Sequence, residues 1–240
     1  MSGELCAHFI HVQKVSFNMQ KCIIDDGFRA DLVEEAVFSG ILEIPTIHRP
    51  AEYIIPTGLV PFSCRKRIAE PGSFLIFYEH DLKFADVLAS TDCYFDDFAA
   101  FAGIVSPDCS LYRDMPLCLQ IANIYMNRAI GCYLQTHGYY VIPNIRWGDE
   151  RTYTTSVLPE KVAFLGVEKH SIVCIGTYGC IQGEKNRHHF RTGLIAMLET
   201  LEPDIVLVYG PMPDNIFHDV INKTRFIQYP DWITLKKRGE

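Results

Sequence analysis

The fold class is clearest in residues 171–209, SIVCIGTYGCIQGEKNRHHFRTGLIAMLETLEPDIVLVY. It predicts two short strands, residues 171–177 and 204–209, separated by a glycine-containing turn and a helix that begins near Glu184. Pro203 ends this helix. Its apolar stripe, at intervals of three and four residues, consists of Phe190, Leu194, Leu198 and Leu201. A strand, a helix and a second strand of this length are typical of a βαβ unit with two parallel strands.

The same alternation of strands and helices extends through most of the chain. We expect a helix capped by Asp114, with Pro116 in its first turn, that ends at Gly138. A shorter helix capped by Asp214 is expected near the C-terminus. Eight apolar runs are candidate strands: residues 43–47, 59–62, 74–78, 102–106, 139–145, 171–177, 204–209 and 225–229. Successive β-then-α units predict an α/β fold built on a parallel sheet.

Eight strands in 240 residues predict a single domain with an irregular, TIM-barrel-like (β/α) barrel. The barrel is expected over residues 41–230, after an N-terminal cap at 1–40 and before a basic tail at 231–240. The first connection between strands contains two prolines and a glycine and has no room for a crossover helix, so the barrel is irregular there. The cap is expected to contain a short helix that includes Leu32, Ala36 and Val37.

The composition excludes several classes of protein. A hydrophobic fraction of 48% and a charged fraction of 21% exclude a disordered chain. No apolar run of roughly 18–20 residues is present and the N-terminus lacks a signal-peptide pattern, so we expect no membrane association and no export. The nine cysteines form no C-x-x-C pair and indicate reduced thiols in a cytoplasmic protein. A net charge of −7 argues against nucleic-acid binding. The sequence leaves the oligomeric state open.

Polar and glycine residues gather where the predicted strands end. The carboxyl ends of parallel strands meet at one edge of the sheet, where ligands bind. The residues expected there are Ser106, Asp108, Asn144, Arg146, Trp147, Asp149, Glu150, Gly176, Thr177, Gly179 and Tyr209. Because side chains alternate along a strand, Asp108 and Arg146 are expected to face each other from neighbouring strands. They either hold a ligand or form an ion pair that ties adjacent loops together.

Acidic residues are the candidate catalytic groups. Asp108 is the candidate general base or metal ligand, and Asp149 or Glu150 is its candidate partner. Asp81 is a further candidate for such a carboxylate pair. A divalent cation is therefore a candidate cofactor.

Basic, aromatic and glycine residues are the candidate ligand contacts. Arg113 and Arg146 would clamp a small anion, Arg128 is a further candidate for this role, and Trp147 would stack on a base or sugar. The loop with Gly176, Thr177 and Gly179 either offers backbone N–H groups to an anion or only forms a turn.

Two features near the start of the second long helix have simpler explanations than a functional site. Adjacent helical residues point about 100° apart, so His188 and His189 cannot bind one metal ion together and are expected on a solvated face. Cys180 lies near the helix N-terminus but has no adjacent base, which makes it a weak candidate nucleophile.

Three segments together resemble a known family. They are Ser106-Pro-Asp-Cys-Ser-Leu-Tyr-Arg-Asp-Met-Pro116, Ile142-Pro-Asn-Ile-Arg-Trp-Gly-Asp-Glu-Arg-Thr152 and Val208-Tyr-Gly210. Over roughly residues 70–230, the chain is similar to a domain-of-unknown-function family of bacterial, phage and mobile-element proteins. The resemblance implies a mobile-element setting and makes the first two segments the expected site. It implies no activity.

Two function hypotheses follow. The first is an enzyme that acts on a small anionic ligand, a nucleotide or sugar phosphate, by acid/base or metal-assisted hydrolysis at the carboxyl ends of the strands. The second is a non-catalytic phage or mobile-element protein that sequesters a nucleotide or docks on a host or replication protein. A nucleic-acid-processing factor is a weaker third hypothesis, because only the mobile-element setting supports it and the negative charge opposes it.

Overall fold

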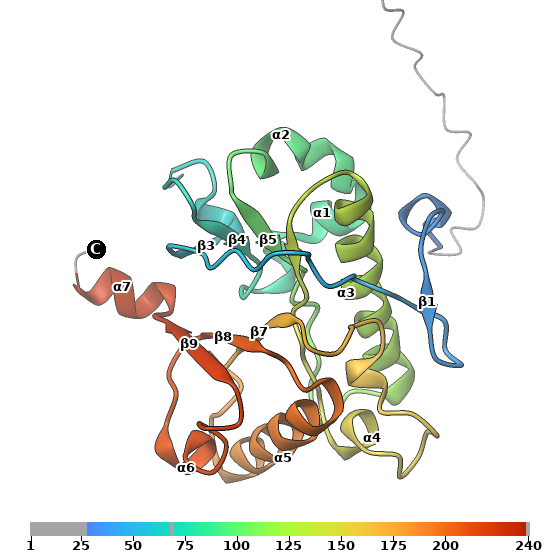
Figure 1. Ribbon diagram of the computed structural model, residues 1–240, viewed down its shortest axis with the longest axis vertical. Helices are drawn as coiled ribbons and strands as arrows, with labels where there is room; N and C mark the ends of the chain where they lie inside the picture. The colour runs from blue at the N-terminus through green and yellow to red at the C-terminus, as the bar shows by residue number, and fades with distance from the viewer. Residues whose placement is uncertain (1–27, 68–69, 239–240) are drawn as a thin grey trace, which may run out of the picture.

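Parallel strands in two sheets form the centre of the molecule in the computed structural model, which describes residues 28–67 and 70–238 (Figure 1). The first sheet has the strand order β3-β4-β5-β6, and the second has the order β7-β8-β9. The strands are β3 (Leu59–Pro61), β4 (Phe74–Ile76), β5 (Gly103–Val105), β6 (Val141–Ile142), β7 (Ile172–Gly176), β8 (Ile205–Tyr209) and β9 (Arg225–Tyr229). All neighbouring pairs within these two sheets are parallel. The predicted α/β class with parallel sheets is confirmed.

The two sheets meet where β6 ends. An isolated parallel bridge joins Asn144 to Cys174 of β7. The backbone N–H of Ile145 donates to the Cys174 carbonyl at 2.8 Å, and that of Cys174 donates to Pro143 at 2.9 Å. Through this bridge the strands follow one another in sequence order from β3 to β9.

The sheets do not close into a barrel, and the predicted TIM-barrel-like fold is corrected in this respect. The expected first strand, residues 43–47, provides β2 (Ile44–Pro45), which pairs antiparallel with β1 (Phe38–Ser39) in a separate two-stranded sheet. Beyond β2, Ile47 makes one isolated parallel bridge, to Val167. Without an eighth parallel strand, no strand pairing in the described part of the chain joins β9 to β3. A side-chain contact crosses this opening, where the Tyr229 hydroxyl donates to the Pro56 carbonyl at 2.7 Å.

Alternate residues of the strands meet in one buried cluster between the two sheets. Its members include Leu59, Phe74, Ile76, Tyr78, Val105, Ile142, Ile172, Cys174, Ile205, Leu207, Tyr209 and Tyr229. The opposite faces of the strands from β3 to β8 are also buried, because helices cover them, whereas β9 leaves Arg225 and Gln228 exposed. The near-continuous apolar character of the strands follows from burial on both faces. Each fully buried Leu, Ile or Phe side chain contributes about 1.5–3 kcal/mol of transfer free energy.

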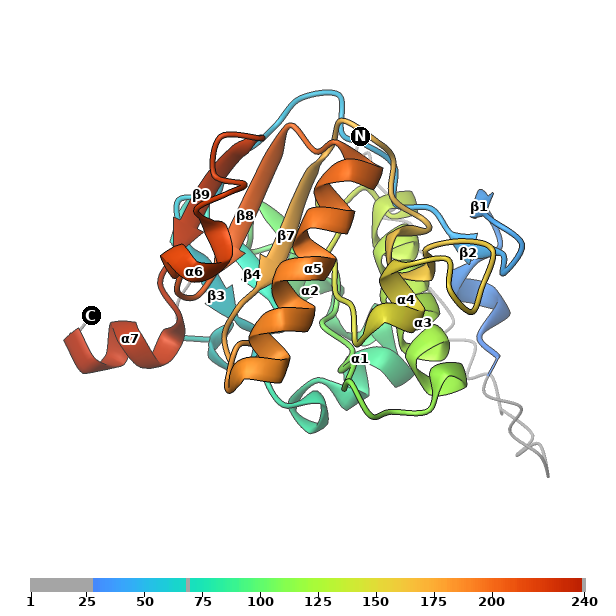
Figure 2. The ribbon, with the colours of Figure 1, turned by 90° about the horizontal axis from the view of Figure 1, so that it is seen from below.

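Two long helices cover the outer faces of the sheets. The helices are α1 (Ala85–Ala89), α2 (Phe95–Phe98), α3 (Leu117–Thr136), α4 (Glu150–Tyr153), α5 (Glu184–Leu201), α6 (Asp214–Phe217) and α7 (Trp232–Arg238), with 3-10 helices η1 (Ala30–Leu32), η2 (Phe62–Cys64), η3 (Asp81–Lys83), η4 (Thr91–Tyr94) and η5 (Val162–Phe164). Helix α3 packs on the first sheet, and α5 lies across the second sheet (Figure 2). The predicted stripe of α5 is buried as expected.

Several predicted helix ends differ in detail. Pro116, and not Asp114, occupies the N-cap position of α3, and Pro213 precedes α6 in place of an Asp214 cap. The expected tail at 231–240 instead forms α7 up to Arg238, because the Asp231 carboxylate accepts the Thr234 N–H at 3.0 Å and starts the helix.

The N-terminal cap is described only from residue 28, and most of the predicted segment 1–40 lies outside the described residues. Within it, the expected helix is the single 3-10 turn η1, which buries Leu32 and leaves Val37 exposed. Within the described ranges, no helix has both the length and the apolar character needed to cross a membrane.

Candidate functional site

A pocket opens at the carboxyl ends of β5, β6 and β7, beside the first turns of α5. It encloses ≈ 660 Å³, including the open space at its mouth. Its lining residues are Asp108, Leu111, Tyr112, Arg113, Ile145, Arg146, Trp147, Gly148, Gly176, Gly179, Cys180, Asn186, His189 and Phe190. Six of the residues predicted from the sequence are in this set: Asp108, Arg113, Arg146, Trp147, Gly176 and Gly179.

An ion pair between Asp108 and Arg146 lies in the wall of the pocket. Arg146 Nη1 donates to Asp108 Oδ2, and Asn144 Nδ2 donates to Asp108 Oδ1 at 2.8 Å. Asp108 is only 6% exposed. Burial raises the pKa of the Asp108 carboxyl, and Arg146 and Asn144 offset part of this rise. Burial opposes the charge of Arg146, but Asp108, together with smaller effects of Cys180, Tyr78 and Asp81, outweighs burial and raises the pKa of the guanidinium. The expectation that these two residues face each other is confirmed.

Asn144 connects the ion pair to a buried tyrosine. The Tyr78 hydroxyl donates to Asn144 Oδ1 at 2.8 Å, and the Tyr78 ring stacks on Tyr209 with ring centroids 5.2 Å apart. Gly176 makes room for this tyrosine, since a Cβ at Gly176 would lie 2.6 Å from the ring. Asn144 and Tyr209 therefore lie beneath the pocket and not in its wall. Tyr78 was not among the residues expected at the site, although its position at the end of the candidate strand 74–78 could have indicated it.

A second buried layer holds the backbone of β6 in place. Ser106 Oγ accepts the Asn144 N–H at 2.8 Å and donates to Asn127 at 3.0 Å. Arg128 is 1% exposed and donates to Asn127, to the Asn144 carbonyl at 2.8 Å, and to two carbonyls of the η5 segment. Burial lowers the pKa of Arg128 to about 9. Ser106 and Arg128 therefore support the site from inside the protein and do not reach the pocket.

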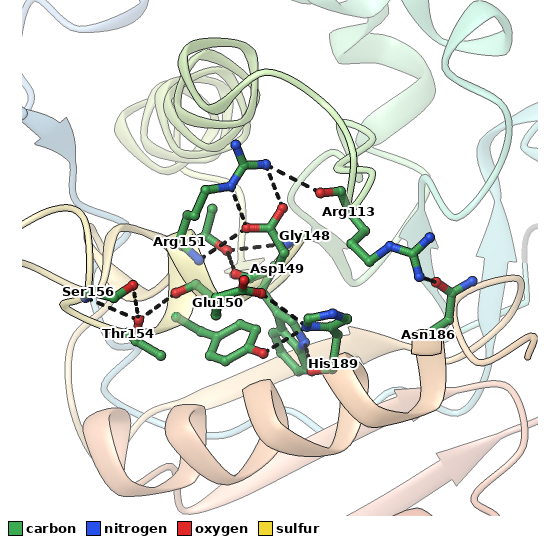
Figure 3. A network of polar contacts seen from close by, with 12 residues as sticks. Arg113, Gly148, Asp149, Glu150, Arg151, Thr154, Ser156, Asn186 and His189 are labelled. Carbon is green, nitrogen blue, oxygen red and sulfur yellow. Dashed lines mark hydrogen bonds and ion pairs between the residues drawn. The ribbon is translucent and has the colours of Figure 1, made fainter. Parts of the chain in front are cut away.

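The second predicted acid, Asp149, is the N-cap of α4. It accepts the Arg151 backbone N–H at 3.1 Å, the Arg151 side chain at 2.8 Å and 2.7 Å, and Gln120 Nε2 at 3.2 Å (Figure 3). Although burial raises the pKa of Asp149, these bonds outweigh burial and lower it. Asp149 is absent from the pocket lining and does not pair with Asp108.

The third predicted acid, Glu150, is exposed. Its Oε2 lies 3.5 Å from His189 Nδ1, so it contacts a pocket residue from outside. The carboxylate that does act on Asp108 belongs to Asp81, which raises the pKa of Asp108 and is held by the Ser110 N–H and hydroxyl at 3.1 Å and 2.6 Å.

Trp147 lines the pocket, but most of its ring is packed into the core. It is 7% exposed, its ring centroid lies 5.2 Å from that of Phe190, and its Nε1 donates to the His189 carbonyl at 3.1 Å. Gly193 of α5 allows this packing, because a Cβ there would lie 2.2 Å from Trp147 Nε1. Its predicted stacking role on a base or sugar stays a prediction.

The glycine loop after β7 contributes Gly176 and Gly179 to the lining, whereas Thr177 turns inward. The Thr177 hydroxyl donates to the Pro211 carbonyl at 2.7 Å and is fully buried. Cys180 also lines the pocket, and burial raises the pKa of its thiol, which disfavours a nucleophilic thiolate.

Two polar residues of α5 complete the pocket. Asn186 accepts from Arg113 Nη1 at 3.3 Å, and His189 lies one turn further along the helix. His188 is exposed, as expected for both histidines, but His189 is only partly exposed and contacts Tyr153 and Glu150 (Figure 3). The sequence alone does not predict that His188 and His189 differ in exposure, because the difference comes from the packing of α4 against α5.

A family model described as a domain of unknown function, DUF4417, matches residues 36–230. The chain belongs to this family. The DUF4417 region covers both sheets and every residue of the pocket. The resemblance to a family of unknown function is therefore confirmed, and the match begins earlier than the segments that suggested it.

Two phage proteins are similar to this DUF4417 chain. The gene 1 protein of Mycobacterium phage D29 is 28% identical over 197 residues, which are 81% of this chain and 68% of the phage protein. The gene 1 protein of Mycobacterium phage L5 is 28% identical over 177 residues, which are 72% of this chain and 73% of the phage protein. No solved structure matches the chain. These relatives connect the domain with phages, and their names state no activity.

Proposed function

We propose that the protein binds a small phosphorylated ligand, a nucleotide or a sugar phosphate, in the pocket at the carboxyl ends of β5, β6 and β7. The observation that carries this proposal is the state of Arg146. Its Nη1 is held by the buried Asp108, whereas its Nε and Nη2 have no hydrogen-bond partner in the described part of the chain and are not sealed from solvent. A guanidinium fixed in this way loses little entropy when it binds an anion.

Arg113 supplies a second cation at the same pocket. It is exposed, and only its Nη1 is engaged, by Asn186 at 3.3 Å. Its carbonyl accepts from Arg151 Nη2 at 3.3 Å, which fixes the segment that carries it. Leu111, Ile145 and Phe190 provide apolar surface for a sugar or base.

Hydrolysis of the bound ligand is the catalytic form of this proposal, with Asp108 as the base. A ligand phosphate that draws Arg146 toward the pocket would free Asp108 Oδ2 to accept a proton from a water molecule, whose oxygen attacks phosphorus. The P–O ester bond then breaks, and Asp108 returns the proton to the leaving oxygen, which departs as the alcohol. Among residues 28–67 and 70–238, no group of three or more His, Cys, Asp or Glu side chains is placed to hold a metal ion.

Isothermal titration calorimetry with a matched set of ligands tests the binding proposal. AMP and ribose 5-phosphate should bind, whereas adenosine and ribose should not. Arg113→Ala should weaken AMP binding roughly 10-fold or more, because it removes hydrogen bonds to a charged group. Arg225→Ala is the matched control, since Arg225 is exposed at the amino end of β9, at the opposite edge of the sheet. Equal affinity for AMP and adenosine, or no AMP binding, would overturn the proposal.

The same ligands separate catalysis from sequestration. AMP and ribose 5-phosphate are incubated with the protein, and the products are identified by ³¹P NMR. Release of inorganic phosphate that is lost in Asp108→Asn supports hydrolysis. Recovery of the bound ligand unaltered supports a non-catalytic protein that sequesters it.

A further inference from the structure

His189 is fixed at the edge of the pocket from two sides. Its ring Nδ1 lies 2.9 Å from the Tyr153 hydroxyl and 3.5 Å from Glu150 Oε2, both on α4 (Figure 3). Its backbone carbonyl accepts from Trp147 Nε1 at 3.1 Å. The side chain is 21% exposed and lines the pocket. A histidine on a freely solvated helix face would have none of these contacts.

The Tyr153 hydroxyl at Nδ1 favours a neutral ring that carries its hydrogen on Nε2. Burial raises the pKa of Tyr153 to about 12, with Glu150 and Asp149 adding to the rise, so the phenol keeps its proton at neutral pH. When this hydroxyl donates to Nδ1, a neutral imidazole has its hydrogen on Nε2. Nε2 has no partner within the described ranges and is not sealed from solvent. The ring can therefore donate from Nε2 without breaking an existing contact.

Glu150 can accept a hydrogen bond from the protonated His189 ring. A protonated imidazole carries hydrogens on both nitrogens, and its Nδ1–H can then donate to the Glu150 carboxylate. Nδ1 thus has a partner whether His189 is neutral or charged. The other titratable groups around it are His188, whose ring centroid is 5.4 Å away, and across the pocket Arg113, Arg146 and Asp108.

The charges of the pocket indicate a role for the protonated form of His189. Arg113 and Arg146 contribute two positive charges and Asp108 one negative charge, which leaves a single net positive charge while His189 is neutral. A phosphate monoester carries about 1.5–2 negative charges at neutral pH. A protonated His189 would raise the pocket to two positive charges and match a dianion.

We propose that His189 is the third anion-binding residue of the pocket, and that it takes up a proton when a phosphate monoester dianion binds, donating Nε2–H to a phosphate oxygen. The proton comes from solvent, and no covalent bond changes. This inference rests on the proposed function, and it narrows the ligand class from small phosphorylated ligands in general to phosphate monoesters that bind as dianions.

Proton uptake is measured by titrating AMP into the protein in two buffers with different ionisation enthalpies. At about pH 7.5 the ligand is mostly dianionic, so uptake reports on the protein. Wild-type protein should take up a large fraction of one proton. His189→Gln should bind AMP without uptake, because the glutamine amide reaches the position of Nε2 and donates but cannot be protonated. His188→Gln is the matched control and should keep the uptake.

The results separate this inference from the proposed function. AMP binding by wild-type protein without proton uptake, or equal uptake by wild type and His189→Gln, would overturn the role of His189 alone. No binding of any phosphorylated ligand would overturn the proposed function and this inference together. His189→Ala, which removes the donor, should weaken AMP binding roughly 10- to 100-fold.

Imidazole ¹⁵N chemical shifts test the same residue without any ligand. In the free protein, the neutral His189 ring should carry its hydrogen on Nε2, with the signal assigned by its loss in His189→Gln. Tyr153→Phe should reduce this preference, because it removes the donor to Nδ1. A hydrogen on Nδ1 in the neutral ring of the wild-type protein would contradict the inference.

Discussion

Arg146, in the segment after β6, forms an ion pair with Asp108, which follows β5, and within the described residues only one of its two terminal nitrogens makes a hydrogen bond. The pair joins adjacent strands of the first sheet at the point where the second sheet begins. Asp108 is the more buried partner, so it holds the guanidinium from the protein side while the pocket remains open to the other side.

Asp108→Asn should strengthen phosphate binding severalfold and lower stability at the same time. The variant removes the one negative charge of the pocket wall, so Arg146 attracts an anion more strongly. It also leaves a partly buried guanidinium without its partner, which costs about 3 kcal/mol of unfolding free energy. AMP titration at a temperature well below unfolding, together with urea denaturation, measures both effects. Weaker phosphate binding by a folded variant would show that Asp108 contacts the ligand and does not merely position Arg146.

Gly176→Ala should disturb the pocket through the buried side chains beneath it. A Cβ at Gly176 would lie 2.6 Å from the Tyr78 ring, and Tyr78 is stacked on Tyr209 and bonded to Asn144. Such overpacking typically costs about 1–3 kcal/mol, and here it also displaces the group that holds Asn144 against Asp108. We expect lower stability and weaker AMP binding.

The matched control for this substitution is Gly58→Ala, where an added Cβ meets nothing within 4 Å. Urea denaturation and AMP titration compare the two variants. A stable Gly176→Ala protein with unchanged AMP affinity would show that the Tyr78 and Asn144 contacts do not set the position of Asp108.

Asp149→Ala should lower stability by about 1–2 kcal/mol at neutral pH and leave AMP binding unchanged. The residue caps α4 and accepts from Arg151 and Gln120, but it is not part of the pocket lining. Because the folded protein lowers the pKa of Asp149, its stabilising effect is present above its ordinary pKa and is lost as the pH falls through the lower, folded value.

The difference in unfolding free energy between wild type and Asp149→Ala should therefore shrink on acidification below about pH 4. Chemical denaturation at neutral and acidic pH measures this difference. A difference that stays constant with pH, or a loss of AMP binding at neutral pH, would contradict the structural role assigned to Asp149.

The parallel strands could be predicted because their residues are almost all apolar, which indicates that they are buried. Continuous apolar runs such as residues 171–177 and 204–209 have no polar face and fit only strands covered on both sides. The failure of barrel closure could not be predicted, because it depends on where residues 43–47 pair. Their apolar side chains suit the small β1–β2 sheet as well as a barrel strand, and local sequence does not distinguish these partners.

The site was predictable where strand geometry decides it. The alternation of side chains brought Asp108 and Arg146 together correctly. The roles of Asp149 and Trp147 depend on other elements: Arg151 draws Asp149 into a helix cap, and Gly193 of α5 opens the space that Trp147 fills. The burial of Arg128 could not be predicted either. Its hydrogen bonds go to uncharged oxygen acceptors, so no acidic residue in the sequence indicates where its side chain lies.

The affinity of Arg146→Gln for AMP, compared with wild type by calorimetry, tests the central proposal most directly. Glutamine keeps a polar, uncharged side chain but removes the guanidinium from the pocket. If the pocket binds a phosphate through Arg146, wild-type protein binds AMP and the folded variant loses at least about tenfold in affinity. Unchanged AMP affinity in Arg146→Gln would contradict it.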